Sequence, residues 1–167
     1  MIRGLVGVIP SHATEVGRFY LLSDYQGGHW LFQCVQTREP LDDGFRRAAL
    51  FLARNGNPDI GVETLPDRSP VVALDDVHVR IDPTSVAGDA STTTIRLGNF
   101  VLDGDAPVLC ARSGRHGWVN VNLSTGQIVD VPGHGWLGFK RWSLVMDDEA
   151  GDELTIVRFD ADEARSG

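Results

Sequence analysis

The amino-acid sequence predicts a mainly β (α+β) fold, in which an antiparallel meander forms a barrel-like or sandwich sheet with one packed helix. Three observations predict this fold. Short apolar runs separated by glycine turns follow one another from residue 93 to residue 159. Val77, Val79 and Ile81 alternate with polar residues, which is the period of a half-buried strand. Only residues 42–54 have clear helical spacing.

Length and composition favour one globular domain. The chain has 167 residues, of which 42% are apolar and 23% are charged, as in ordinary globular proteins. We expect a single domain over residues 1–160 and a frayed C-terminal tail over residues 161–167. Residues 82–92 are the one candidate for an internal boundary, but the sections on either side are too small to be stable alone.

The N-terminal part of the chain predicts strands. Residues 2–9 are expected to form a first strand, which Pro10 ends. Residues 18–36 are expected to form a hairpin, because two apolar runs flank a turn that contains Gly27 and Gly28.

Residues 42–54 are predicted to be the helix. Its apolar face follows the i, i+3, i+4, i+7 spacing, and its members are Phe45, Ala48, Ala49 and Leu52. Asp42 or Asp43 is suited to cap the start. The pair Asn55-Gly56 is interpreted as the C-terminal stop, with Pro58 beyond it. A helix with this apolar face is expected to pack on a sheet.

The remaining elements are strands separated by loops. Residues 56–69 have the composition of a loop, residues 70–74 are apolar, and residues 77–81 alternate as a strand. Residues 82–92 are expected to form a flexible loop. Further strand candidates are residues 93–102, 107–112, 118–123, 127–131, 136–146 and 154–159. Their short, regular spacing is what predicts the antiparallel meander.

The charge balance restricts the class of partner. The chain has 15 basic and 23 acidic residues and a net charge of -8, which disfavours nucleic acid and anionic membranes as partners. An acidic surface is compatible with a basic protein partner, and it also keeps a protein soluble. Four local acid clusters are interpreted as solvated turn acids: Asp42-Asp43, Asp75-Asp76, Asp103 with Asp105, and Asp147-Asp148-Glu149.

Cysteine usage and the N-terminus point to the cytoplasm. Cys34 and Cys110 lie inside apolar runs and are predicted to be buried small hydrophobes rather than a disulfide or metal pair. The apolar run at residues 5–9 is too short for a signal-peptide core or a membrane span. We therefore expect a cytoplasmic protein.

A histidine lies in a glycine-rich turn just before a tryptophan at three places. His29 precedes Trp30, and His116 and His134 lie in the turns before Trp118 and Trp136. Three such histidines can converge on zinc or iron, as in cupin-like β barrels. The usual pair of histidines two residues apart, followed by a carboxylate, is absent. Turn chemistry is therefore the favoured interpretation, and we expect no cofactor.

The tryptophans are candidates for binding. Trp118 shares the more polar face of its predicted strand with Asn120 and Asn122, so exposure is easier to expect for Trp118 than for the other tryptophans. Core packing is the favoured interpretation of the tryptophans, because tryptophan is usually largely buried. The candidate binding residues are Trp118, Asn120, Asn122, His116, His134 and Trp136.

These observations favour a non-enzymatic, acidic binding protein that docks on or inhibits a protein partner. No nucleophile motif, P-loop or dinucleotide fingerprint is present, so no catalytic residue is assigned. The alternative is a metal-dependent β-barrel enzyme that uses His29, His116 and His134. A carbohydrate-binding module is a weaker alternative. A homodimer is plausible, because a meander leaves edge strands that pair between subunits.

Overall fold

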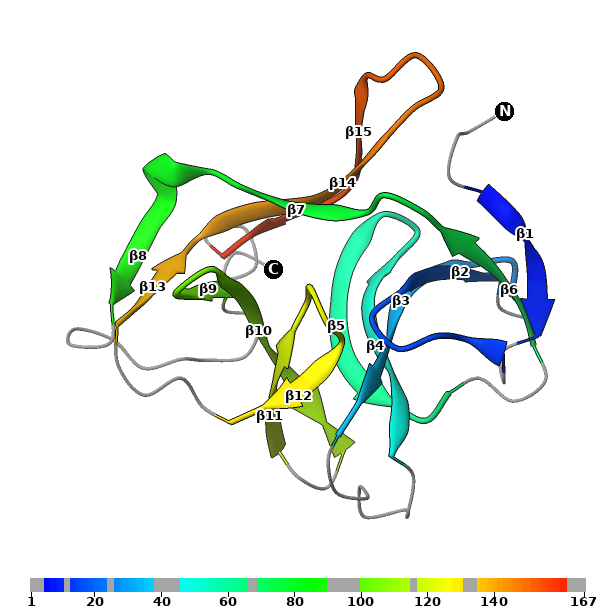
Figure 1. Cartoon of the computed structure of the whole chain (residues 1–167), viewed down its shortest axis with the longest axis horizontal. Coiled ribbons are helices and arrows are strands. Elements are labelled where there is room, and N and C mark those ends of the chain that lie inside the picture. Colours follow the sequence, from blue (N-terminus) through cyan, green and yellow to red (C-terminus); the bar gives the residue numbers. More distant parts are fainter. Residues whose placement is uncertain are drawn as a thin grey trace.

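The fold is mainly β, as predicted (Figure 1). The computed structural model describes residues 5–10, 13–23, 26–37, 46–65, 69–89, 100–114, 117–130 and 135–161. The described strands form two sandwich-like sheets, one large and mixed and one with three strands.

The large sheet contains twelve of the described strands. They are β1 (Leu5–Pro10), β2 (Phe19–Ser23), β3 (His29–Gln36), β4 (Arg47–Arg54), β5 (Asn57–Glu63), β6 (Pro70–Leu74), β8 (Val86–Asp89), β9 (Phe100–Asp103), β10 (Ala106–Ser113), β11 (Gly117–Asn122), β12 (Gln127–Val129) and β13 (Trp136–Phe139). The smaller sheet consists of β7 (His78–Ile81), β14 (Arg141–Asp147) and β15 (Glu153–Asp160), in the order β15-β14-β7. A short 3-10 helix, η2 (Pro83–Ser85), connects β7 to β8.

The predicted meander is present in part of the large sheet. Strands β9, β10, β11 and β12 are consecutive antiparallel neighbours, and β2 and β3 form the predicted hairpin. The sheet as a whole is mixed rather than antiparallel. Gln127 of β12 pairs in parallel with Gln36 of β3, and Ser113 of β10 pairs in parallel with Val62 of β5. These contacts join segments distant in sequence, which hairpin spacing alone does not predict.

The predicted helix at residues 42–54 is wrong where the structure describes it, because residues 47–54 form β4. Ala48, Leu50 and Leu52 face the main core, whereas Ala49 and Phe51 belong to a second apolar cluster. A strand covered on both faces is apolar at almost every position, so it also matches helical spacing. The start of the predicted helix, residues 42–45, lies outside the described residues.

The interpretation of Asn55-Gly56 as a helix stop is also wrong. Both residues have positive φ, 50° for Asn55 and 79° for Gly56, and they form the two-residue loop between the paired strands β4 and β5. Asn-Gly is the preferred sequence for such a hairpin turn, because its twist matches that of the flanking strands. Strand β5 consequently occupies half of the segment at residues 56–69 that was expected to be a loop.

Three other boundaries differ from the prediction. Residues 136–146 form two strands, β13 and β14, which lie in different sheets. Residues 83–89 form η2 and β8 instead of a flexible loop, held in part by the pairing of β8 with β13. Within the predicted strand at 93–102, the described part begins with β9 at Phe100. Residues 90–99, and residues 162–167 of the tail predicted at 161–167, lie outside the described residues.

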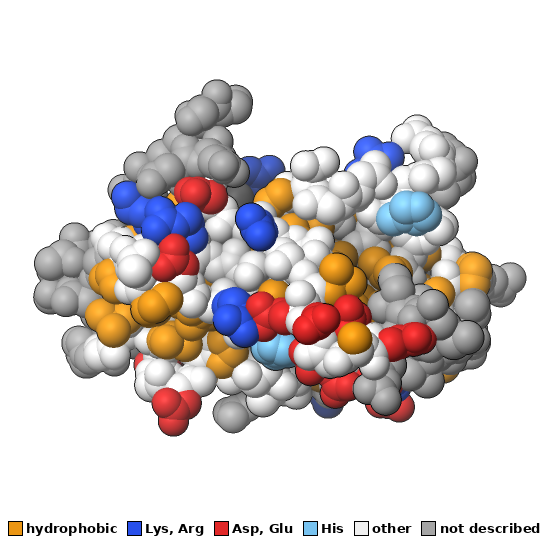
Figure 2. All heavy atoms as spheres, turned by 90° about the horizontal axis from the view of Figure 1, so that it is seen from above, with side chains coloured by type: hydrophobic (Ala, Val, Ile, Leu, Met, Phe, Trp, Pro, Cys, Tyr) orange, Lys and Arg blue, Asp and Glu red, His pale blue; other side chains and the backbone are white. Residues whose placement is uncertain are grey.

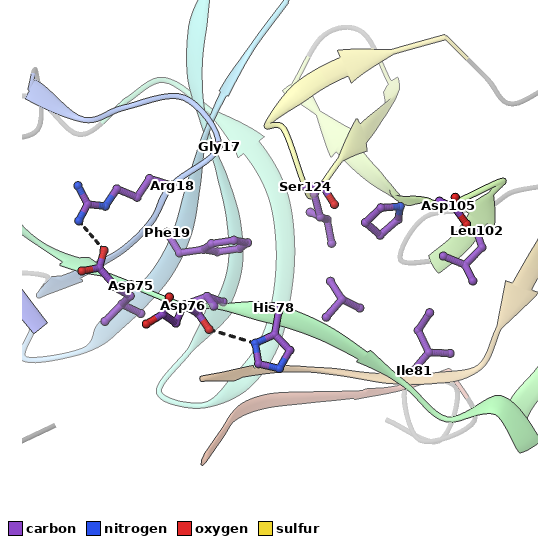
Figure 3. Close-up of a pocket in the computed structure, with 15 residues that line it drawn as sticks. Gly17, Arg18, Phe19, Asp75, Asp76, His78, Ile81, Leu102, Asp105 and Ser124 are labelled. Carbon is purple, nitrogen blue, oxygen red and sulfur yellow. Dashed lines mark hydrogen bonds and ion pairs between the residues drawn. The ribbon is translucent and has the colours of Figure 1, made fainter. Parts of the chain in front are cut away.

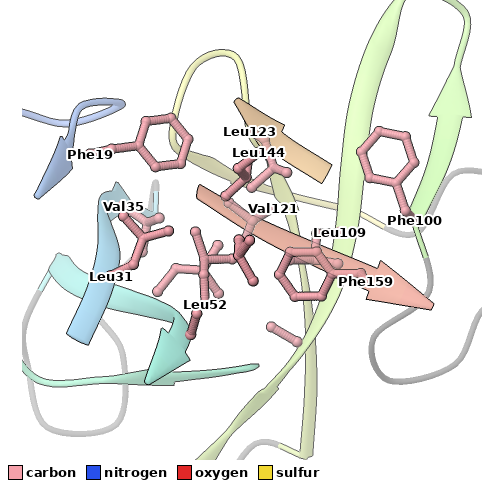
Figure 4. Packing of buried hydrophobic residues seen from close by; sticks show 14 of the residues in the cluster. Phe19, Leu31, Val35, Leu52, Phe100, Leu109, Val121, Leu123, Leu144 and Phe159 are labelled. Carbon is pink, nitrogen blue, oxygen red and sulfur yellow. The ribbon is translucent and has the colours of Figure 1, made fainter. Parts of the chain in front are cut away.

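The main core lies between the two sheets (Figure 4). Phe19, Leu52, Leu109 and Val121 of the large sheet meet Leu144 and Phe159 of the three-stranded sheet. An aromatic stack also joins the sheets. The rings of Phe100 and Trp142 are 4.9 Å apart, and those of Trp142 and Phe159 are 3.9 Å apart and nearly parallel. This packing fixes the position of β7, which pairs with β14.

Candidate functional site

The structure places the predicted tryptophan and asparagine residues in different environments. Trp118 is 59% exposed, as expected, whereas Trp136 is buried. Asn120 is only 6% exposed, and its Oδ1 has no hydrogen-bond partner. The Oδ1 of Asn122 accepts a hydrogen bond from the backbone N–H of Ser124, at 2.9 Å. Of these residues, only Trp118 presents a large free surface, so the role of the whole group in binding stays a prediction.

Two of the three histidines in the metal-site hypothesis, His116 and His134, lie outside the described residues. His29 is exposed, and its Nδ1 lies 3.2 Å from Ser23 Oγ. Within the described ranges, no group of three His, Cys, Asp or Glu side chains is arranged to hold a metal ion. The convergence of His29, His116 and His134 therefore remains untested.

Both cysteines are free and buried, as predicted. Burial raises the pKa of the Cys110 thiol to about 11. A thiol with so high a pKa is almost fully protonated near neutral pH and is a poor nucleophile. The arrangement gives no support for Cys110 as a catalytic residue.

A cleft of about 550 Å³ lies between β7 and the ends of several strands of the large sheet (Figure 3). Its lining comes from four segments, residues 17–19, residues 74–81, the β9–β10 region at 102–107, and the turn at 123–124. Phe19, Ile81 and Leu102 give it apolar walls. Ligand pockets in proteins have this size and this combination of apolar walls with a few polar groups.

Carboxylates dominate the charged part of the cleft. Asp75, Asp76 and Asp105 line it, and Arg18 is the cation among the lining residues. Arg18 donates to Asp75 Oδ1 at 2.5 Å, and this hydrogen bond raises the pKa of the Arg18 guanidinium. No described cation pairs with the carboxylate of Asp76 or Asp105. The lining therefore keeps an excess of negative charge after its internal ion pair is formed.

His78 lies beside this acidic rim. Its Nδ1 lies 3.1 Å from the backbone oxygen of Asp76, a contact that suits the tautomer with the proton on Nδ1, because a carbonyl oxygen only accepts. Its Nε2 lies 3.8 Å from Glu153 Oε2, and Arg80 pairs with the same carboxylate. Asp76 has φ 56°, a left-handed conformation that aspartate tolerates better than most residues.

Gln33 holds two walls of the cleft together. Its side chain is fully buried, and its Nε2 donates to Gly17 O at 3.0 Å and to Leu123 O at 2.7 Å. The backbone N–H of Leu123 in turn donates to Pro107 O at 2.8 Å. A buried amide with two carbonyl partners fixes both loops, so the segments at 17–19, 102–107 and 123–124 are held relative to one another.

Two glycines allow the close approach on which this network depends. A Cβ on Gly126 would lie 2.5 Å from Gly17 N and 2.8 Å from Cys34 O, and the φ of Gly126 is +72°. Gly17 N donates to Cys34 O at 2.8 Å, and Gly126 O accepts from Gln36 N at 2.8 Å. Side chains at either glycine would separate the turn after β11 from β3.

A second hollow of about 450 Å³ lies on the three-stranded sheet. Its lining contains three arginines and three acids, and four of these six residues form two ion pairs. Arg80 pairs with Glu153, and Arg141 Nε donates to Asp82 Oδ2 at 2.9 Å. Because these charges neutralise one another, this hollow is a weaker candidate than the cleft.

Sequence reasoning recognised the acids of the cleft but not their arrangement. Asp75-Asp76 and Asp105 were interpreted as solvated turn acids. Asp76 and Asp105 are indeed exposed, and the structure brings all three acids to one cleft. Gln33 had no signal apart from being a polar residue inside an apolar run, Trp30 to Val35. Such a residue is expected to bond to buried backbone groups, as its Nε2 does, whereas its Oε1 has no hydrogen-bond partner among the described residues.

Comparisons with protein family models, curated proteins and solved structures found no match for this chain. Within the described residues, none of the helices has the length and apolar character needed to cross a membrane.

Proposed function

We propose that this protein is a non-enzymatic binding protein that docks on a protein partner, and that the cleft between β7 and the large sheet is its binding site. The observation that carries this proposal is the combination of apolar walls and unpaired carboxylates in a cleft of about 550 Å³. Polar groups in such a cleft orient a ligand, and the apolar walls supply most of the binding free energy.

The rigidity of the walls supports a binding role. Hydrogen bonds from Gln33 and from the N–H of Leu123 hold three of the lining segments in place before any ligand arrives. A site that is already ordered loses less conformational entropy when it binds. By contrast, the described lining contains no pair of nucleophile and base in hydrogen-bond contact, which is the arrangement needed for covalent catalysis.

A displayed library of random dodecapeptides tests the proposal. Peptides selected on the wild-type protein should lose binding to a Ser124→Trp variant, measured by isothermal titration calorimetry. Ser124 is an exposed residue of the cleft wall, so an indole there fills the cleft without entering the core. Failure to select any peptide, or equal binding of the selected peptides to Ser124→Trp, would contradict the proposal.

Carbohydrate binding is a second candidate because Trp118 is 59% exposed. A free indole face stacks well on a sugar ring. Trp118 lies opposite Arg112 on β10, and the exposed Arg112 side chain can add a hydrogen-bond donor at this site. Tryptophan fluorescence titrations against a glycan panel, with Trp118→Ala as the comparison, test this function independently of the cleft.

A further inference from the structure

We infer that the cleft binds a basic segment of a protein partner, in which two cationic side chains flank apolar residues. This inference rests on the proposed binding function and specifies the chemistry of its ligand. It follows from the distribution of charge and apolar surface along the cleft.

The two carboxylates that have no cation partner among the described residues lie at opposite sides of the cleft. In Figure 3, Asp76 lies on one side, next to Asp75, and Asp105 lies on the other side. Asp75 is already satisfied by Arg18. Asp76 and Asp105 thus provide two separate negative positions, and each is exposed enough to receive a cation without the cost of deep burial.

Apolar side chains occupy the space between these two positions. In Figure 3, Phe19 lies on the side of Asp76, and Ile81 and Leu102 lie on the side of Asp105, so apolar surface extends between the two carboxylates. A compact cation or an inorganic ion cannot cover this surface. A ligand that contacts both carboxylates and also buries the apolar middle needs charged ends and an apolar centre, as in a basic-apolar-basic peptide segment.

Long-range electrostatics favour the same partner. The protein has a net charge of -8, and the exposed acids Asp147, Glu149 and Asp152 lie on the β14–β15 hairpin, whose Glu153 adjoins His78 of the cleft. Figure 2 shows acidic side chains gathered on one part of the molecular surface. Such a field attracts a basic segment and repels nucleic acid.

Three capped hexapeptides test the inference by calorimetry. The first has the sequence GRLLRG, the second replaces both arginines with the neutral isostere citrulline, and the third is GELLEG. We expect the arginine peptide to bind at least about tenfold more tightly than the citrulline peptide, and the glutamate peptide not to bind. This ratio corresponds to two partly exposed ion pairs.

Variants of the protein test whether Asp76 and Asp105 cause the preference for the arginine peptide. Asp76→Asn with Asp105→Asn should weaken the arginine peptide about tenfold and leave the citrulline peptide unchanged. Asparagine also tolerates the left-handed backbone of residue 76. The matched control, Asp59→Asn with Asp130→Asn, removes the same charge from exposed positions outside the cleft and should change binding less than about twofold.

The outcomes separate this inference from the proposed function. If the arginine and citrulline peptides bind equally and both lose binding to Ser124→Trp, the inference that the ligand is cationic is wrong. The proposal that the cleft binds a protein segment is not contradicted by that result. The same holds if library peptides bind the cleft but the arginine peptide does not. Binding of the arginine peptide that persists in Ser124→Trp, or equal weakening by both double variants, would overturn the inference because binding would not involve these carboxylates.

Discussion

At the scale of single residues, Gln33 is the polar group on which the cleft most depends. Its Nε2 supplies hydrogen bonds to Gly17 O and Leu123 O in a fully buried position. Gln33→Leu keeps a similar volume but leaves two carbonyls without a donor, so it should lower the free energy of unfolding by about 2–4 kcal/mol. Urea denaturation of the variant and the wild type measures this loss.

The Gln33→Glu variant is the control, because it keeps the shape of the side chain and changes its hydrogen-bonding groups. An ionised glutamate has no donor for the two carbonyls and carries a buried charge, so its pKa should be raised. The variant should be least stable at neutral pH and recover part of the loss as pH falls and the side chain becomes protonated. Wild-type stability of Gln33→Glu at pH 7 would contradict the assigned role of the amide.

Asp82 is a residue whose titration should contribute to acid stability. Its pKa is lowered from 3.8 to about 2 by hydrogen bonds from the Thr84 hydroxyl, from Arg141 and from the Thr84 backbone N–H. Because the folded pKa lies below the unfolded value, this stabilisation is present above pH 4 and is lost as pH falls toward about 2. The difference in stability between the wild type and Asp82→Asn should therefore shrink over this interval in pH-dependent thermal unfolding. A constant difference would argue against this role.

At the scale of elements, the β4–β5 hairpin depends on the conformation of its two-residue turn. Gly56 has φ 79°, and a Cβ there would meet no atom within 4 Å, so the penalty of a side chain is conformational rather than steric. Gly56→Ala should lower the free energy of unfolding by about 1–2 kcal/mol. Gly61 of β5 is the matched control, because its φ is not positive and its nearest contact, Arg112 O, is at 3.8 Å. Gly61→Ala should cost less than half as much in the same urea titration.

The same hairpin shows what could be predicted from sequence. Isolated apolar runs bounded by turn residues identified the β class, the β2–β3 hairpin and the consecutive strands β9 to β12. Residues 47–54 were mistaken for helix because burial on both faces removes the alternation that distinguishes a strand. The Asn55-Gly56 pair carried the correct signal, since Asn-Gly is a stronger sign of a hairpin than of a helix stop.

The cleft could not be predicted from sequence, because it depends on tertiary contacts that local patterns do not show. Asp76 and Asp105 are 29 positions apart in the chain. They reach one cleft because the chain leaves the large sheet after β6, and β7 then pairs with β14 in the smaller sheet. Local patterns describe each acid as a solvated turn residue and contain no information on that pairing. The exposure of Trp118 was predictable, because it depends on the alternation within one strand.

At the scale of the whole molecule, the aromatic stack couples the two sheets that form the cleft. Trp142 of the three-stranded sheet lies between Phe159 of its own sheet and Phe100 of the large sheet. It is also the cross-strand partner of Ile81, which lines the cleft. Loss of the indole should therefore weaken both the fold and the position of one cleft wall.

Trp142→Ala should lower the free energy of unfolding by about 3–5 kcal/mol, because it removes a large buried ring and leaves a cavity between the sheets. Trp142→Phe should cost less than half of this, because it keeps an aromatic ring in the stack. Trp118→Ala is the matched control, since Trp118 is 59% exposed whereas Trp142 is 3% exposed, and it should cost less than about 1 kcal/mol. Urea denaturation followed by far-UV circular dichroism measures all three variants without relying on indole fluorescence. Similar losses for Trp142→Ala and Trp118→Ala would mean that the stack does not couple the sheets.

If the stack does couple them, Trp142→Phe should also retain more affinity for cleft-binding peptides than Trp142→Ala, because β7 stays closer to its position beside the large sheet.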